Sequence, residues 1–113
     1  MHELSIAQSI LTTALNAAED NAEKVTGITL QIGVLSGIEI TALEFAFSII
    51  KKDTLLSNAE LIIESAAGEA VCKNCGNLFP LATYGTACNQ CNCHNIKILK
   101  GREMKIINLI VEE

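Results

Sequence analysis

Four cysteines stand in two short pairs in the second half of the chain. The pairs are Cys72-Lys-Asn-Cys75 and Cys88-Asn-Gln-Cys91, and twelve residues separate them. A tetrahedral zinc site needs four soft donors about 2.3 Å from the metal, and each C-x-x-C turn supplies two of them. Gly76, directly after the first pair, provides the backbone freedom that such a turn requires. The spacing therefore predicts a structural zinc site in a compact ribbon, because the linker is shorter than the usual stretch of about 15–20 residues.

Redox chemistry is the alternative for a C-x-x-C pair. Redox-active pairs sit at helix N-termini, where the pKa of the first cysteine is lowered. Both pairs here lie in loop-like sequence, which makes redox chemistry the weaker interpretation. Four thiolates also leave no open coordination position of the kind that a catalytic zinc needs. The predicted zinc site is therefore a scaffold.

Cys93 and His94 follow the second pair, and their role stays open. The plain interpretation is a spare thiol and a surface histidine. Either residue could instead be a substitute zinc ligand, and His94 could serve a second metal. A thiol enzyme with a reactive Cys93 is a rival class, which a strongly lowered thiol pKa would favour.

The tripeptide Met1-His2-Glu3 opens the chain. It could be no more than the frayed start of a helix. The same residues could also chelate a metal, through the Met1 amine, the His2 amide and imidazole, and the Glu3 amide or carboxylate. The first N–H groups of a helix have no intrahelical acceptor, so a proton can be lost there without breaking a helical bond. Planar nitrogen and oxygen donation suits Ni(II) or Cu(II) equally.

Composition excludes several classes of protein. The 113 residues include 8 Lys and Arg against 13 Asp and Glu, and no Trp. Net acidity argues against nucleic-acid binding by phosphate neutralisation, and the few aromatic residues leave little to stack on bases. A zinc ribbon of the transcription or RNA machinery is a rival class, but it would need basic residues around the cysteines. Only four lie nearby: Lys73, Lys97, Lys100 and Arg102.

The start of the chain lacks the basic segment of a signal peptide, and polar residues interrupt its apolar stretch. No apolar run reaches the roughly 18 residues of a membrane span. We therefore expect a cytoplasmic protein, in whose reducing environment cysteines serve as metal ligands or reactive thiols.

Hydrophobic periodicity predicts a helix over residues 4–22, ended by Gly27. A capping-box pattern at Ser5–Gln8 places its regular start after the first few residues and leaves the N-terminus free. Alternation predicts a strand over residues 28–34. The apolar helix face comprises Leu4, Ala7, Leu11, Ala14, Leu15, Ala18 and Ala22.

A second capping box at Thr41–Glu44 predicts a helix over residues 42–50. Further strands are predicted at 59–65 and 103–111. The fold class is therefore α+β, with two helices packed on a small, about three-stranded sheet and a zinc-ribbon lobe inserted before the last strand. The predicted domains are 1–70 plus 100–113 and, for the lobe, 71–99, with Gly68 and Gly101 as hinges.

In its motifs and their order, the chain resembles the HypA/HybF family of nickel metallochaperones of [NiFe]-hydrogenase maturation. The resemblance covers essentially all 113 residues. It rests on the doubled C-x-x-C and on four further segments: Met1-His2-Glu3-Leu4-Ser5, Gly33-Val34-Leu35-Ser36-Gly37-Ile38-Glu39, Leu43-Glu44-Phe45-Ala46-Phe47 and Gly101-Arg102-Glu103-Met104.

The resemblance implies a nickel carrier that is not an enzyme. It implies that His2 and Glu3 hold Ni(II), with the Met1 amine and Glu39 as further candidates, and that Cys72, Cys75, Cys88 and Cys91 hold Zn(II). Glu39 is either a fourth donor or a group that orients His2, and its plain alternative is a solvated carboxylate. The chain departs from the family pattern at Cys93-His94, where Gly or Ser is usual.

The resemblance also implies partners. These are the GTPase HypB and the precursor of the [NiFe]-hydrogenase large subunit, with a urease maturation factor for some members. Self-association as a homodimer is compatible with the high hydrophobic fraction. Neither nucleic acid nor a membrane is expected as a partner.

Overall fold

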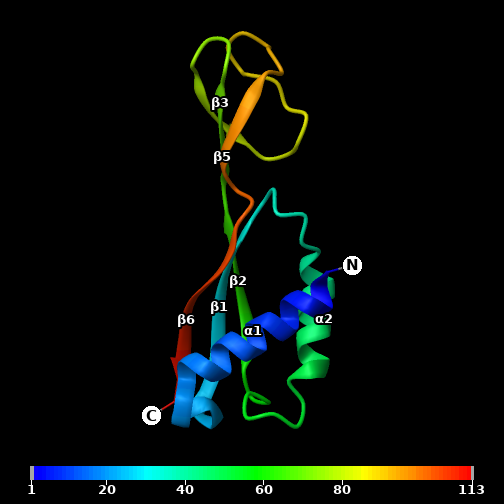
Figure 1. Cartoon of the computed structure of the whole chain (residues 1–113), viewed down its shortest axis with the longest axis vertical. Helices are drawn as coiled ribbons and strands as arrows, with labels where there is room; N and C mark the ends of the chain where they lie inside the picture. Colours follow the sequence, from blue (N-terminus) through cyan, green and yellow to red (C-terminus); the bar gives the residue numbers. More distant parts are fainter. Residues whose placement is uncertain (1, 113) are drawn as a thin grey trace. The chain divides into compact units, whose positions relative to one another are not determined.

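The protein is described by a computed structural model, which covers residues 2–112 (Figure 1). The fold class is α+β as predicted, with two α-helices and two small sheets. In the described residues, no helix has the length and apolar character needed to cross a membrane. The elements in chain order are α1 (Glu3–Ala18), a 3-10 helix η1 (Glu19–Lys24), β1 (Val25–Gly33), α2 (Ile40–Ile50), β2 (Glu60–Ala66), β3 (Gly68–Cys72), β4 (Leu78–Leu81), β5 (Ile96–Lys100) and β6 (Met104–Val111).

The chain forms two compact units. The first unit runs up to residue 30 and adds 38–63 and the chain from 106 onwards. The second unit comprises 31–37 and 64–105. The division into domains 1–70 with 100–113 and 71–99 stays a prediction. The second compact unit contains more residues than the predicted lobe 71–99.

In the first unit, α1 packs against α2 (Figure 1). α1 presents small buried residues, among them Ala7 and Ala14, which let the helices approach closely. α2 contributes Leu43 and Phe47, both essentially fully buried. Truncating a buried aromatic side chain such as Phe47 to alanine typically costs about 3–5 kcal/mol. Packing of these apolar stripes therefore holds the two helices together.

Strand β1 is the centre of the sheet that has the order β2-β1-β6. Both neighbours cover its edges, so its side chains are more buried than theirs. Ile28, Leu30 and Ile32 alternate along one face and are at most 3% exposed. The predicted strands at 59–65 and 103–111 correspond to β2 and β6, with ends that differ by one residue.

The predicted start of the first helix is wrong. α1 begins at Glu3, His2 is its N-cap residue, and the His2 carbonyl accepts the Ile6 N–H at 2.9 Å. Ser5 lies inside the first turn and caps nothing there. Packing of the Ala7 and Ile10 side chains extends the helix past the local capping signal.

The predicted end of the helical region is also wrong. α1 ends at Ala18, because Glu19 adopts φ +50°, and β1 already begins at Val25. Gly27 lies within the strand rather than before it. A Cβ atom there would stand 3.1 Å from the Cδ1 atoms of Ile62 and Ile110, so this glycine makes room for cross-strand isoleucines.

Helix α2 is capped by Glu39, not by Thr41 as the capping box predicts. The Glu39 carboxylate accepts the N–H groups of Thr41 at 3.1 Å and Ala42 at 3.3 Å. The helix consequently begins at Ile40, two residues earlier than predicted.

The second unit contains a sheet with the order β4-β3-β5, in which both pairings are antiparallel. Ala70 lies opposite Phe79 on one side and Ile98 on the other. These strands were not predicted from the sequence, since they are short and show little alternation of apolar and polar residues. Their core is small: Leu35, Ala70, Cys72, Phe79, Leu81 and Cys88, with Cys93, Ile96 and Ile98 packed against it.

Three glycines of the second unit lie where backbone segments approach too closely for a side chain. A Cβ atom on Gly33 would lie 2.0 Å from the Gly101 carbonyl oxygen, and one on Gly101 would lie 2.6 Å from the Gly68 Cα. Gly101 also has φ +118°. The Glu103 carboxylate accepts the Gly101 and Arg102 N–H groups, which lowers the pKa of Glu103. These contacts account for the glycines by close packing, and the hinge role of Gly68 and Gly101 stays a prediction.

Replacing Gly33 by alanine should destabilise the protein by about 2–3 kcal/mol, because backbone atoms would have to move. Gly27→Ala in the same strand is the matched control. It should cost less than about 1 kcal/mol, since it meets only the ends of flexible side chains. Urea unfolding of the zinc-loaded variants measures both, and equal losses would contradict the close approach at Gly33.

Candidate metal centres

The four predicted zinc ligands come together in the second unit. The Sγ atoms of Cys72, Cys75, Cys88 and Cys91 all lie within 4.8 Å of one another. The Cys72–Cys91 pair is 3.5 Å apart and the Cys75–Cys88 pair 3.7 Å. Four ligands at 2.3 Å in a regular tetrahedron stand about 3.8 Å apart, so the spacing fits a zinc ion at the centre.

The two C-x-x-C turns have the same backbone design. The Gly76 N–H donates to the Cys72 carbonyl at 2.8 Å, and the Asn92 N–H donates to the Cys88 carbonyl at 3.0 Å. Both residues follow the second cysteine of their pair, and both are left-handed, with φ +78° and +60°. Gly76 was predicted to serve the turn, whereas Asn92 was missed. Asn92 could have been found from its position, because it follows Cys91 as Gly76 follows Cys75. Asparagine is also among the few residues that tolerate a left-handed backbone.

Hydrogen bonds to sulfur favour thiolates at two of the positions. The Cys75 backbone N–H lowers the pKa of Cys72, and the Cys91 and Gln90 N–H groups lower the pKa of Cys88 to about 6. At Cys75 the Asn77 N–H acts in the same direction, but burial and the neighbouring sulfurs outweigh it and raise the pKa to about 12. Crowded thiolates repel one another, and a divalent cation among them would offset that repulsion.

Two asparagines that were not predicted support the sulfurs. Asn77 donates through Nδ2 to Cys88 Sγ at 3.6 Å and to Asn89 Oδ1 at 2.7 Å. Asn74 Nδ2 lies 3.9 Å from Cys91 Sγ. Both lie within two residues of Cys75, yet the sequence does not show which asparagine side chains turn towards sulfur.

Cys93 lies outside the group of four sulfurs found among residues 2–112. Its side chain is partly buried against the core of the second unit, and its Sγ accepts the Asn95 N–H at 3.4 Å. The Cys93 carbonyl accepts the Cys88 N–H at 2.9 Å. His94 is exposed. These contacts give Cys93 a packing role beside the cluster.

The start of α1 lies beside the start of α2 in the first unit. The Glu39 N–H donates to Glu3 Oε2 at 3.2 Å, which joins two of the predicted nickel residues across 36 positions of sequence. His2 is exposed and is the N-cap residue of α1. Met1, whose amine was a further candidate, lies outside the described residues.

Glu39 has two roles in this arrangement. Its N–H holds the Glu3 side chain, and its own carboxylate caps α2. Both backbone donors reach the same carboxylate oxygen, Oε1. The choice between an orienting role and that of a metal donor stays open at this point. The structure gives Glu3, and not His2, as the residue that Glu39 contacts.

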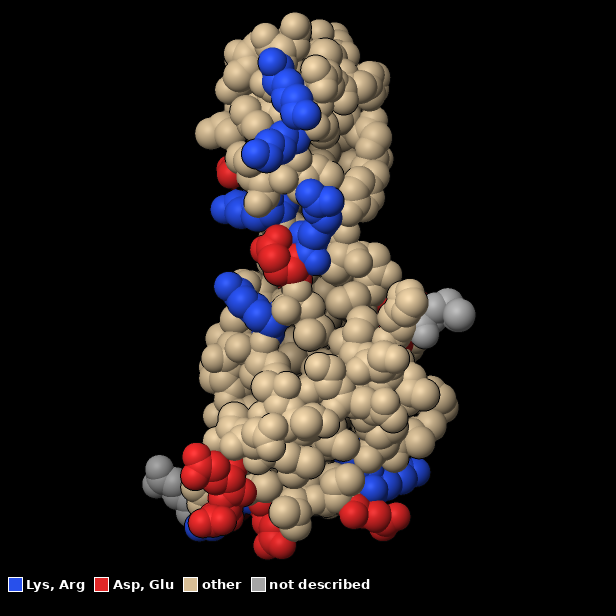
Figure 2. All heavy atoms as spheres, viewed as in Figure 1, with Lys and Arg blue, Asp and Glu red and all other residues tan. Residues whose placement is uncertain are grey.

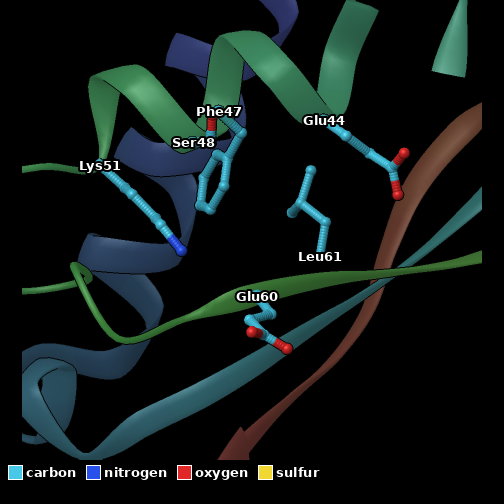
Figure 3. Close-up of a pocket in the computed structure, with 6 residues that line it drawn as sticks. All are labelled: Glu44, Phe47, Ser48, Lys51, Glu60 and Leu61. Carbon is cyan, nitrogen blue, oxygen red and sulfur yellow. The ribbon is translucent and has the colours of Figure 1, made fainter. Parts of the chain in front are cut away.

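A shallow pocket in the first unit lies between α2 and β2 and is lined by Glu44, Phe47, Ser48, Lys51, Glu60 and Leu61 (Figure 3). Its lysine is committed, because Lys51 Nζ donates to the Ala59 carbonyl at 2.8 Å. The two glutamates come from different elements and belong to no metal-binding group found in the described residues. We assign the pocket no role.

Comparison with known proteins identifies the family. The model of the HypA family, described as a metallochaperone of hydrogenase and urease nickel incorporation, matches residues 1–111. The chain belongs to the HypA family. It is 39% identical over 113 residues to hydrogenase maturation factor HypA of Prosthecochloris aestuarii and 37% identical to that of Chlorobaculum tepidum. Each alignment covers 99% of this chain and all of the relative.

A solved structure supports the same assignment. The solution structure of the Ni metallochaperone HypA from Helicobacter pylori matches with a TM-score of 0.69 and 28% identity, over 98% of this chain and 97% of that one. HypA proteins are nickel metallochaperones, so this chain is a maturation factor rather than an enzyme.

Asn92 offers a test of the backbone geometry of the second C-x-x-C turn. Asn92→Val should lower the stability of the zinc-loaded protein by about 1–2 kcal/mol, because a β-branched residue is strained at φ +60°. Asn92→Gly should be tolerated, since glycine adopts that conformation without strain. Thermal unfolding together with competition against a chromophoric zinc chelator measures the effect. Equal behaviour of the two variants would contradict the role of the left-handed turn.

Proposed function

We propose that this chain binds Ni(II) through its N-terminus and delivers it, in the cytoplasm, for the maturation of [NiFe]-hydrogenase or urease. The observation that carries the proposal is the position of His2. It is exposed at the N-cap of α1, directly before the first helical residue Glu3. The His2 amide can lose its proton to a metal without breaking a helical hydrogen bond. The imidazole on the same residue completes a chelate ring.

Glu3 and Glu39 complete the proposed site. Glu3 would bind through its backbone or carboxylate, and the Met1 amine would supply a further donor. We propose that Glu39 acts by positioning Glu3, because its N–H already holds Glu3 Oε2. Planar nitrogen and oxygen donors are the set that Ni(II) accepts.

We further propose that Cys72, Cys75, Cys88 and Cys91 hold a structural Zn(II). The sulfur spacing and the buried positions of Cys72 and Cys88 support it. The ion would supply stability to the second unit and no reaction, since four thiolates fill a tetrahedral site. The two metals would then have separate residues and separate tasks.

A carrier must both hold and release its metal. A dissociation constant near micromolar corresponds to about −8 kcal/mol, which contacts with a partner can offset. A site at the exposed start of a helix suits release, because few residues need to move. The proposed partners are the GTPase HypB and the hydrogenase large subunit precursor, with a urease maturation factor as a further recipient.

Calorimetric titration of Ni(II) into zinc-loaded protein tests the site. We expect one saturable site near micromolar that His2→Ala abolishes while the zinc content stays unchanged. His94→Ala, which removes the only other histidine, is the matched control and should bind as the parent does. Loss of nickel binding in His94→Ala but not in His2→Ala would move the nickel site to the zinc-binding unit.

Glu39 variants separate a positioning role from ligation. Glu39→Gln keeps an oxygen for the α2 cap and the same backbone N–H, so nickel affinity should fall less than threefold. Glu39→Ala should cost about 1 kcal/mol of folding stability through loss of the cap. The same titration and urea unfolding measure both. A loss of tenfold or more in nickel affinity for Glu39→Gln would make its carboxylate a ligand.

Nickel binding should weaken as the pH falls from 7.5 to 6. Imidazole binds a metal only when neutral, and a bound amide nitrogen must lose its proton. Protons therefore compete with Ni(II), and the dissociation constant should rise at least tenfold over this range. Calorimetry in buffers of different ionisation enthalpy also counts the protons released. A constant affinity would exclude the proposed ligands.

A further inference from the structure

The sheet of the second unit has two unlike faces. Along β3 and β4, residues alternate between the core and the surface. Ala70, Cys72, Phe79 and Leu81 point to the core, and Ile96 and Ile98 of β5 pack against it. The intervening residues form the opposite side of the sheet, which we call the outer face. It carries one acidic residue, Glu69, opposite Lys100 and Pro80. Its other members are three cations and three apolar side chains: Lys73, Lys97, Lys100, Val71, Leu78 and Leu99.

The second unit has more basic than acidic residues, unlike the rest of the chain. Its basic residues are Lys73, Lys97, Lys100, Arg102 and Lys105, against the acidic Glu64, Glu69 and Glu103. The remainder of the chain carries three basic and ten acidic residues. Figure 2 shows the basic side chains gathered on the second unit. A basic patch on an acidic protein favours an acidic partner, and it steers association.

The outer face also exposes large apolar side chains. Leu78 is 59% exposed and Leu99 46%, beside the lysines of the same face. Lysines alone would serve to protect the edge strand β5 from pairing with other chains. Exposed leucines on both outer strands work against such protection, whereas they suit a surface that a partner covers.

The same face is poorly suited to nucleic acid. Binding of single strands uses aromatic side chains on which bases stack. The exposed positions of β3, β4 and β5 carry no aromatic residue. Phe79 points into the core, where it is 3% exposed.

We propose that the outer face binds a protein segment in which acidic residues are interspersed with apolar ones. The lysines would pair with the carboxylates, and Leu78, Val71 and Leu99 would contact the apolar side chains. β5 is the terminal strand of its sheet, so an extended segment can lie along it. The proposal concerns docking of a partner protein and does not depend on the nickel ligands.

A synthetic decapeptide tests this face on the full, zinc-loaded protein. In the peptide, glutamate alternates with leucine and valine, and its binding is followed by 1H–15N NMR. We expect chemical-shift changes concentrated at residues 69–73, 78–80 and 96–100. We expect the affinity to fall at least fivefold between 50 and 300 mM salt, as paired charges are screened.

Charge reversal provides the variant and its control. Lys97→Glu with Lys100→Glu should weaken peptide binding at least tenfold. Lys24→Glu with Lys52→Glu, at exposed positions of the first unit, gives the same net charge and should bind as the parent does. Zinc content and the dispersion of the NMR spectrum show that each variant is folded. If Lys97→Gln with Lys100→Gln is used where reversal disturbs β5, the loss should be at least threefold.

Other occupants give distinct results. A peptide with lysine in place of glutamate should not bind. Equal binding of polyglutamate or of a ten-nucleotide thymidine strand would show a general anion patch and overturn the proposal. Salt-sensitive self-association in sedimentation, lost on charge reversal, would make a second copy of the chain the occupant and overturn it equally. Peptide-induced shifts confined to the first unit would place the binding surface elsewhere.

Discussion

The convergence of four cysteine sulfurs on one point is the constraint on which the second unit depends. Their Sγ atoms lie within 4.8 Å of one another, and two of them belong to a core of only six buried residues. A core of that size supplies little stability by itself. A divalent cation among the sulfurs would bind all four as thiolates and join both C-x-x-C turns to the sheet. Backbone and asparagine donors to the sulfurs, and left-handed residues after each pair, prepare the geometry for it.

The first unit places its candidate metal residues in a different way. There the apolar stripes of α1 and α2 bring together two helix starts, and one hydrogen bond from Glu39 to Glu3 joins them. The donors are oxygen and nitrogen atoms near the surface, not buried sulfur. This contrast in chemistry suits a retained ion in one unit and a transferred ion in the other. Membership of the HypA family makes the chain a nickel metallochaperone, and the assignment of nickel to the first unit is our proposal.

The sequence predicted the features that depend on local spacing. The two C-x-x-C pairs specify their own cluster, and the alternation of Ile28, Leu30 and Ile32 specifies a strand. It failed at the two helix starts. Packing extends α1 past the Ser5 capping box, and at α2 one local cap, Glu39, takes the place of another, Thr41. The contact between Glu3 and Glu39 could not be predicted, because it depends on how two helices pack.

The central claim is that one chain holds two metals through separate donor sets. X-ray absorption at the nickel and zinc edges of one doubly loaded sample tests it most directly. We predict four sulfur neighbours at about 2.3 Å around zinc. Around nickel we predict only nitrogen and oxygen neighbours, in a planar arrangement. Sulfur in the first shell of nickel, or nitrogen replacing sulfur around zinc when nickel is added, would contradict the account.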